Sequence, residues 1–350
     1  MNTDRVTLHD VARQLGVSHT TVAMALKNHP RISKNRREQV QKMAEQMGYQ
    51  PDPFLSGLAA YRRRKHTAKF QGVIAWVNHM EQPERMRGFR EFDEYWQGAK
   101  EAAARFGYQL EDIRWPVDCS AKGFERILVA RGIPGLLIPP HPPGLNWSDF
   151  DWSRFSLVRF GMSVRNPDSN LVTSDQHRAV VMAVTRIRDY GYQRIGLVAD
   201  PDFERSLGGN YYGAFCWAQR LLELDPVLPT HLVRNELYRA DPAKELRALE
   251  RWLDRHRPDA LLTPMAPVPA MLQKLGYRIP KDVAVAGTSV LDLPLDAGID
   301  QHSRAIGRIG VEMLVKQIHV NERGEPSDPC RILVESTWRD GKSLPRRRQA

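Results

Sequence analysis

The first fifty residues place three short amphipathic helices so close together that few folds can accommodate them. Apolar residues at spacings of three and four predict the first helix, which Thr7 is expected to cap, and a three-residue turn at 16–18 follows it. Ser18 and Ser33 are expected to cap the second and third helices, and Gly48 to end the third. Two helices joined by so short a turn, with a third in support, predict a helix-turn-helix, with another small three-helix bundle as the plainer alternative. The expected core positions are Leu8, Val11, Ala12, Leu15, Val22, Ala25, Leu26, Val40, Met43, Ala44 and Met47.

The positive charge of the chain is concentrated in the same region. The 350 residues carry a formal net charge of +10, and residues 1–66 hold twelve Lys and Arg against five Asp and Glu. The remaining residues, with 39 basic and 36 acidic groups, carry a net charge of only +3. This asymmetry indicates a nucleic-acid or anionic-membrane partner for the N-terminal part, with a solvated basic face as the plainer interpretation.

The segment VTLHDVARQLGVSHTTVAMALKNHPRISKNRREQVQKMAEQMGYQPDP closely resembles, without gaps, the DNA-binding head of the lactose-repressor (LacI/GalR) family. The resemblance implies that the second helix lies in the major groove of an operator, with His19, Thr20 and Met24 at its base-reading positions. It implies phosphate contacts through hydroxyl, helix-end N–H and cationic groups. The residues given these contacts are Thr7, Ser18, Thr21, Arg31, Ser33 and Arg36, and Tyr49, where the head ends, is a further DNA-binding candidate.

Two positions of the second helix depart from the family pattern. Ala23 replaces the usual Ser, which removes one hydroxyl contact, and Met24 stands where an Arg is frequent. Because Arg makes the bidentate contact to guanine, we expect an operator that depends less on guanine at that step.

Residues 51–68 resemble the hinge helix of the same family, which folds only when two copies meet on DNA. Gly57 and the shortness of the segment 54–61 predict a helix that is marginal alone. The resemblance implies that Leu58 inserts between base pairs in the minor groove, with Leu55 where an alanine is usual. The basic run from Arg62 to Lys65 is expected to contact phosphates or the narrow groove, and a solvated linker is the alternative.

From Phe70 onward, short apolar runs alternate with amphipathic helices, which predicts an α/β core with parallel sheets. Over most of its length the core resembles the two-lobed, periplasmic-binding-protein-like domain of the family. The predicted domains are a head at 1–50, a hinge at 51–68 and an effector-binding and dimerisation core at 69–345. The first lobe is expected at about 69–191 and 299–322, and the second at about 193–293 and 328–342, so the chain should cross near 191–193, 293–299 and 322–330.

The expected effector site departs from the family at three polar positions. Asn210 stands where an Arg grips the ligand, Thr263 begins a segment that replaces an Asn-Asp pair, and Ser289 falls in the place of an aromatic-Asp pair. Asp175 matches an acidic position near the effector, with a helix N-cap as the alternative. Aromatic and neutral polar groups at the pocket edge would suit a sugar or another uncharged ring compound, with core packing as the alternative for the tryptophans. The edge candidates are Trp76, Asn78, His79, Tyr211 and Trp217.

The sequence also lacks the motifs that are typical of several other classes of protein. The cysteines Cys119, Cys216 and Cys330 are scattered, which favours neither a disulfide framework nor a zinc site and fits a reducing cytoplasm. No apolar run approaches a membrane span, and the N-terminus has no apolar signal region. No catalytic, metal or cofactor motif is present, so we expect no enzyme activity and no cofactor.

The leading hypothesis is a homodimeric, ligand-responsive DNA-binding regulator of the cytoplasm, most simply a repressor. Two heads are needed because one head reads only half of a pseudo-palindromic operator. A sugar-like effector would act through its different affinities for two lobe arrangements. The alternatives are a solute-binding protein without a regulatory role, and a DNA-bound regulator that lacks a small-molecule effector or responds to a protein partner.

Overall fold

The computed structural model describes residues 8–26, 29, 32–47, 49, 70–80, 84–116, 118–141 and 147–347. The contacts predicted for Thr7, Arg31, Leu55, Leu58 and Arg62 therefore lie outside the described residues. Within these ranges, no helix combines the length and apolar character that a membrane span requires.

The N-terminal head is the predicted helix-turn-helix with a supporting helix. It consists of α1 (Leu8–Gln14), α2 (His19–Leu26) and α3 (Lys34–Gln46). Gly16 adopts a positive φ of 64° in the turn between α1 and α2, a conformation that favours glycine. The three helices share one core, whose fully buried members are Val11, Ala12, Val22, Ala25, Val40 and Ala44.

The first lobe is built on a six-stranded sheet with the strand order β11-β5-β4-β3-β1-β2. All neighbouring strands run parallel. Alternate residues of β1 face opposite sides: Ile74 and Trp76 join the layer of α6 and α14, and Ala75 and Val77 join the layer of α7. The strands are β1 (Gly72–Asn78), β2 (Tyr108–Arg114), β3 (Gly135–Ile138), β4 (Ser156–Phe160), β5 (Asn170–Ser174) and β11 (Arg331–Val334). The helices are α5 (Glu84–Gly88), α6 (Arg90–Arg105), α7 (Ala121–Ala130), the short 3-10 helix η1 (Trp152–Arg154) and α14 (Ser303–Val320).

The second lobe repeats the architecture with the strand order β12-β10-β9-β8-β6-β7. Only β12 runs antiparallel to its neighbour. The strands are β6 (Ile195–Ala199), β7 (His231–Leu232), β8 (Ala260–Thr263), β9 (Ala284–Gly287), β10 (Gly298–Asp300) and β12 (Thr337–Arg339). The helices are α8 (Gln176–Asp189), α9 (Pro201–Ser206), α10 (Asn210–Leu221), α11 (Asn235–Ala240), α12 (Pro242–His256) and α13 (Val268–Lys274).

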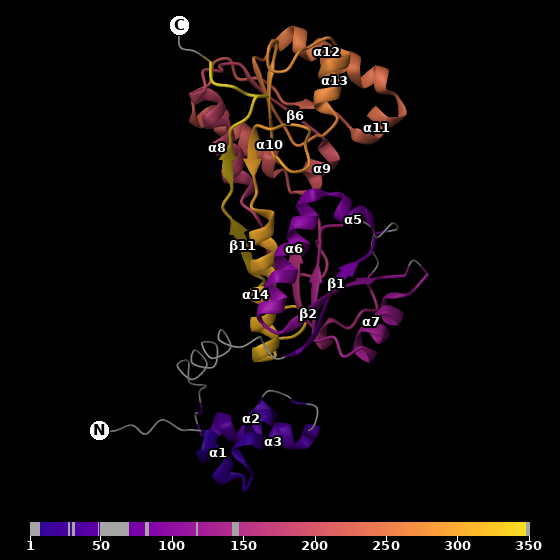
Figure 1. Cartoon of the computed structure of the whole chain (residues 1–350), viewed down its shortest axis with the longest axis vertical. Helices are drawn as coiled ribbons and strands as arrows, with labels where there is room; N and C mark the ends of the chain where they lie inside the picture. Colours follow the sequence, from indigo (N-terminus) through magenta and orange to yellow (C-terminus); the bar gives the residue numbers. More distant parts are fainter. Residues whose placement is uncertain are drawn as a thin grey trace, which may run out of the picture.

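The chain crosses between the lobes three times, at positions that differ from the predicted ones. The helix α8 packs on the second sheet, so the first crossing lies next to Asp175, not at 191–193. The strand β10 also belongs to the second sheet, which puts the second crossing at 301–302. The strand β11 pairs with β5, so residues 331–334 belong to the first lobe, and the third crossing lies at 335–336. Figure 1 shows α14, in gold, running beside α6.

The physical reason for the differences is that an alternating strand and helix pattern does not say which sheet a helix covers. The apolar face of α8 could cover either sheet, and the pairing of the neighbouring strands determines which sheet it covers. The predicted parallel α/β architecture with two lobes is nevertheless confirmed.

Candidate functional site

The helix α2 presents two of its three predicted base-reading side chains to solvent. His19 and Thr20 are exposed, and Met24 is half-buried. The imidazole ring of His19 stacks on that of His9 in α1, with centroids 4.7 Å apart and planes inclined by 29°. This stacking, which the sequence pattern did not indicate, holds the first residue of α2 against α1.

The hydroxyl groups at the start of α2 form the predicted cap. Ser18 Oγ accepts a hydrogen bond from the backbone N–H of Thr21 at 3.1 Å and lies 2.8 Å from Thr21 Oγ1. Ser33 holds the N-cap position of α3, but its exposed hydroxyl makes no cap hydrogen bond, which differs from the expectation. The backbone of Ser33 has the extended conformation of an N-cap residue, with φ −59° and ψ 152°, so only the side-chain bond of the cap is missing.

Two other predicted DNA contacts have protein partners in the head. Arg36 Nη1 donates to Gln39 Oε1 at 3.0 Å along α3. Tyr49 is half-buried, packs against the core of the head, and donates its backbone N–H to the carbonyl of Ala44 at 2.9 Å. Tyr49 therefore anchors the end of the head, whatever contact its ring makes to DNA.

Polar side chains from both lobes meet where α6 and β5 of the first lobe approach α10 and the loop after β9 of the second. We call this group the interlobe cluster, and it consists of Glu91, Ser174, Tyr211, Ser289, Asp292 and Gln301. Buried polar groups contribute binding specificity when they converge from two walls of one site. This is the position between the sheets where the sequence analysis expected an effector.

Gln301, at the second crossing, links the two lobes by its side-chain amide. Its Oε1 accepts from Ser174 Oγ at 2.7 Å, and its Nε2 donates to the carbonyl of Thr288 at 2.9 Å and to Tyr211 Oη at 3.4 Å. Burial raises the pKa of Tyr211, with the charge of Glu91 as a further cause, so the phenol stays protonated. A crossing residue is therefore fixed to both sheets.

The helix α6 begins at the boundary between the lobes, and its first turn is bonded to the second lobe. The carboxylate of Asp292 accepts hydrogen bonds from the backbone N–H groups of Arg90 at 2.6 Å and Glu91 at 3.3 Å. Burial raises the pKa of Asp292, and the two N–H groups oppose this.

Glu91 itself is a perturbed carboxylic acid. Burial is the main cause that raises its pKa to about 7, and the charges of Asp292 and Asp300 act in the same direction, whereas a hydrogen bond with Ser289 lowers it. Its Oε1 atom is buried without a hydrogen-bond partner. A carboxyl group with such a pKa exchanges its proton near neutral pH, and perturbed groups of this kind gather at functional sites.

Among the six predicted effector residues, the structure brings only Ser289 into the interlobe cluster. Asn210 and Asp175 lie beside it: Asn210 Nδ2 donates to Gln176 Oε1 at 3.0 Å, and Asp175 caps α8 by accepting from the N–H of Arg178 at 3.0 Å. Thr263 is fully buried, and its Oγ1 donates to the carbonyl of Val198 and accepts from the N–H of Met265.

Trp76 and His79, the remaining two, lie in the first lobe. Trp76 is 1% exposed, packs between Trp96 and Phe160, and donates its Nε1–H to the sulfur of Met86 at 3.1 Å. Its environment is that of core packing. The ring of His79 lies edge-on to that of His141, and burial together with His141 lowers the pKa of His79 to about 3, so it stays neutral.

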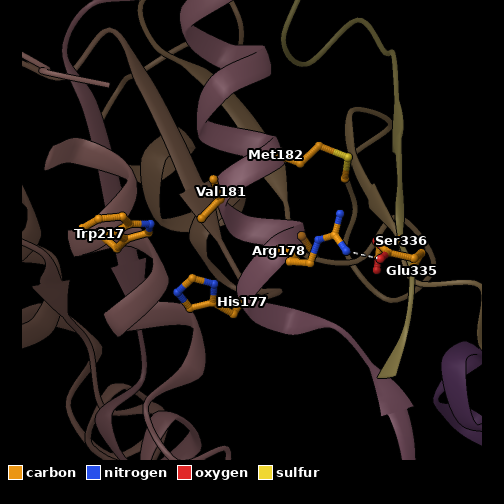
Figure 2. A pocket seen from close by; sticks show the side chains of 8 residues that line it. His177, Arg178, Val181, Met182, Trp217, Glu335 and Ser336 are labelled. Atoms are coloured by element: carbon orange, nitrogen blue, oxygen red, sulfur yellow. Dashed lines mark hydrogen bonds and ion pairs between the residues drawn. The ribbon is translucent and has the colours of Figure 1, made fainter. Parts of the chain in front are cut away.

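A hollow of about 460 Å³ lies elsewhere, over α8 and next to the third crossing. Figure 2 shows His177, Arg178, Val181 and Met182 projecting from one helix, with Trp217 on one side and Glu335 and Ser336 on the other. Arg178 forms an ion pair with Glu335 across it. None of the six predicted effector residues lines this hollow, although Trp217, an edge candidate, does.

Four members of the interlobe cluster were not predicted from the sequence: Glu91, Ser174, Asp292 and Gln301. Glu91 and Asp292 resemble ordinary charged residues of a helix start and a loop, and Ser174 and Gln301 stand at a strand end and in a loop with no motif around them. Phe89 stands at the N-cap of α6 and its side chain cannot accept a hydrogen bond. This missing cap is the sequence feature that indicates an acceptor from elsewhere in the chain. Among the described residues, no group of three or more His, Cys, Asp or Glu side chains is placed to hold a metal ion.

The head, the two-lobed core and the interlobe cluster together define a class: a helix-turn-helix transcriptional regulator with a binding-protein-like core. Residues 7–52 match the model of the bacterial regulatory proteins of the lacI family, and residues 184–344 match the periplasmic binding protein-like domain. The chain therefore joins a lacI-family DNA-binding domain to a periplasmic binding protein-like domain.

Relatives of known function extend over nearly the whole chain. The HTH-type transcriptional repressor CytR of Escherichia coli is 24% identical over 352 residues, covering 95% of this chain and 96% of that protein. The HTH-type transcriptional repressor PurR of Haemophilus influenzae is 23% identical, covering 91% and 93%. Both relatives are transcriptional regulators.

Solved structures share the fold at lower identity. The transcriptional regulator CelR in complex with cellobiose has a TM-score of 0.58 and 18% identity, covering 97% of this chain and 100% of that one. The lac repressor dimer bound to operator and the anti-inducer ONPF has a TM-score of 0.52 and 16% identity, covering 98% and 100%.

Proposed function

We propose that this protein is a dimeric transcriptional repressor whose affinity for a pseudo-palindromic operator is controlled by a small sugar-like metabolite bound between the lobes. The observation that carries the proposal is the interlobe cluster, in which both lobes contribute buried polar groups at one place. A ligand that contacts both lobes has different affinities for different lobe arrangements, and only such a difference can change the affinity for DNA.

The DNA-binding part of the proposal assigns roles within the head and hinge. His19, Thr20 and Met24 read bases from α2, while Ser18, Thr21, Ser33 and Arg36 bind phosphates. The residues outside the described ranges keep their predicted roles: Thr7, Arg31 and Arg62 at phosphates, Leu58 with Leu55 in the minor groove. Two copies supply the two heads that a palindrome needs, and the protein works in the cytoplasm, where its operator lies.

The relatives support the choice of ligand and assembly. CelR was solved with cellobiose, and the lac repressor as a dimer on its operator. CytR and PurR are named as repressors. The neutral amide and hydroxyl groups of Gln301, Ser174 and Tyr211 suit hydroxyl-rich ligands, because each can donate or accept.

The test has two arms with the full chain. Selection from random duplexes is expected to return a pseudo-palindrome bound with a steep salt dependence, and a thermal-shift panel of mono- and disaccharides is expected to raise the melting temperature with at least one compound. A stabilising compound must then change operator affinity. Selection that returned no palindrome would contradict the proposal.

One observation favours a second candidate, a DNA-bound regulator without a small-molecule effector. The polar groups of Thr263 and Gln301 already have protein hydrogen-bond partners, so fewer donors and acceptors remain for a ligand. If operator binding is tight and no compound in a broad metabolite panel changes either stability or affinity, this second candidate replaces the first.

A further inference from the structure

The helix α6 starts without a cap from its own lobe. Its N-cap residue, Phe89, makes no side-chain cap hydrogen bond, because a phenyl ring offers no acceptor. The first N–H groups of any α-helix have no partner within the helix, so they need an external acceptor. Here that acceptor is the carboxylate of Asp292, which lies 202 residues further along the chain than Arg90.

The acceptor belongs to the other lobe. Asp292 lies in the loop between β9 and β10, and both strands are members of the second sheet. Ser289 shapes this loop by accepting the N–H of Leu291 at 3.2 Å. The same Ser289 lies close enough to Glu91 to lower its pKa, so one loop of the second lobe faces both the backbone and a side chain of the first turn of α6.

The two bonds depend on how the lobes are placed. A carboxylate that accepts two N–H groups at 2.6 and 3.3 Å loses both when the loop moves away by about 1 Å, since hydrogen bonds fade beyond about 3.5 Å. The helix dipole adds an attraction for the negative charge at the same point. Twisting one lobe against the other would therefore leave α6 uncapped and Asp292 half-buried without donors.

We infer that Asp292 is a positioning residue that holds the two lobes in the arrangement seen here by capping α6 across the lobe boundary. The inference rests on the proposed function, in which the lobe arrangement sets operator affinity. It adds that the arrangement has an intrinsic bias, present before any effector binds. Removal of the cap should shift the equilibrium between lobe arrangements about fivefold, which is the effect of a typical helix cap.

The chain supplies a matched control in Asp296. Its carboxylate also accepts two backbone N–H groups, from Lys342 and Ser343, each at 2.8 Å. All three residues belong to the second lobe, next to β10 and β12. Asp296→Ala therefore removes two backbone bonds of the same kind as Asp292→Ala, and neither of them crosses the lobe boundary.

The experiment measures the distance between the lobes in the full chain. The three native cysteines are replaced by serine, and spin labels are attached at Arg126→Cys in α7 and Glu250→Cys in α12, both exposed positions. Double electron–electron resonance then gives the interlobe distance distribution without DNA or effector. Amide hydrogen exchange of the peptide that covers residues 90–92 reports the cap directly.

Asp292→Ala is expected to broaden or shift the distance distribution and to speed exchange at residues 90–92. Asp292→Asn is expected to give a smaller change than Asp292→Ala, because the amide keeps one acceptor oxygen and replaces the other with an NH2 donor, so one of the two bonds remains. Asp296→Ala is expected to lower the melting temperature and to leave the distance unchanged. An unchanged distribution in Asp292→Ala, an equal shift in Asp296→Ala, or an Asp292→Asn variant as altered as Asp292→Ala overturns the inference. Because the distances are read without DNA, loss of operator binding would bear on the proposed function alone.

Discussion

A Cβ atom on Gly98 of α6 would lie 1.9 Å from the backbone carbonyl oxygen of Arg304 in α14. The relationship is reciprocal, since a Cβ on Gly307 of α14 would lie 1.9 Å from the carbonyl oxygen of Tyr95 in α6. The two helices therefore pack with backbone against backbone. The helix α14 follows directly after the second crossing, and α6 starts at the cross-lobe cap. Both members of this closely packed pair therefore begin at the lobe boundary.

Gly98→Ala is expected to lower the free energy of unfolding by about 3 kcal/mol, at the upper end of the usual cost of overpacking. The cost is high because the obstacle is backbone, which cannot rotate away as a side chain can. Urea denaturation followed by circular dichroism measures it. Gly88→Ala in α5 is the control, because a Cβ there meets nothing within 4 Å. Equal stabilities of the two variants would show that the helices separate readily.

Trp76→Ala is expected to cost about 3–5 kcal/mol of unfolding free energy, as for other buried aromatic residues. The reason is its burial among Trp96, Phe160 and Met86. Trp217→Ala is the matched control: this side chain is 52% exposed, and its loss should change stability by no more than about 0.5 kcal/mol. A Trp76→Phe variant with normal stability but no response to a stabilising ligand would instead make Trp76 an effector contact.

The contribution of Glu91 to the free energy of unfolding is expected to fall as the pH rises from about 4.5 to about 7, whereas His79, whose pKa is lowered to about 3, contributes in the opposite direction. The pKa of Glu91 is raised from its ordinary value of 4.5 to about 7, so in this window the folded chain keeps a proton that the unfolded chain has released. Above pH 7 both states are ionised and the contribution levels off. Thermal melting across pH 5–8 should show the melting temperature of the parent chain falling relative to that of Glu91→Gln.

Glu101→Gln serves as the control for this measurement, because Glu101 is exposed on the same helix. Its melting temperatures should follow the parent chain across the whole range. A Glu91→Gln profile that runs parallel to that of the parent chain would mean that Glu91 does not carry the proton.

His19→Ala is expected to weaken binding to the selected operator by about 5- to 150-fold, the range of 1–3 kcal/mol for a base-reading contact. Binding to a scrambled duplex should change little, since phosphates carry that affinity. Fluorescence anisotropy with both duplexes at one salt concentration measures the difference, with His177→Ala on α8 as the control. An equal loss on both duplexes would assign His19 to phosphate contact.

Local patterns in the sequence were enough to predict the head. Spacings of three and four around Val11 and Val22, with a turn at Gly16, depend only on neighbours along the chain, and the structure confirms the three helices. The strands of the core were recognised for the same reason. Helix and strand signals extend over a few residues, so a single sequence shows them.

Pairings over long sequence separations could not be predicted in this way. Nothing near Glu91 indicates that Asp292 lies against it, and nothing near Val334 tells that its strand joins β5 rather than the second sheet. The predicted positions of the lobe crossings differ from the observed ones for this reason. Asp175 shows the limit in a single residue, because a carboxylate after a strand suits a cap and a ligand contact equally, and the structure shows the cap.

The C-terminal strands have a consequence for the way the protein is made. The strand β11 covers the open edge of β5 in one lobe, and a few residues later β12 covers the edge of β10 in the other, where Asp340 accepts a hydrogen bond from the phenol of Tyr190. A ribosome therefore releases neither lobe in finished form before residues 331–339 emerge. Until then β5 and β10 remain edge strands, and the two edges are covered one shortly after the other.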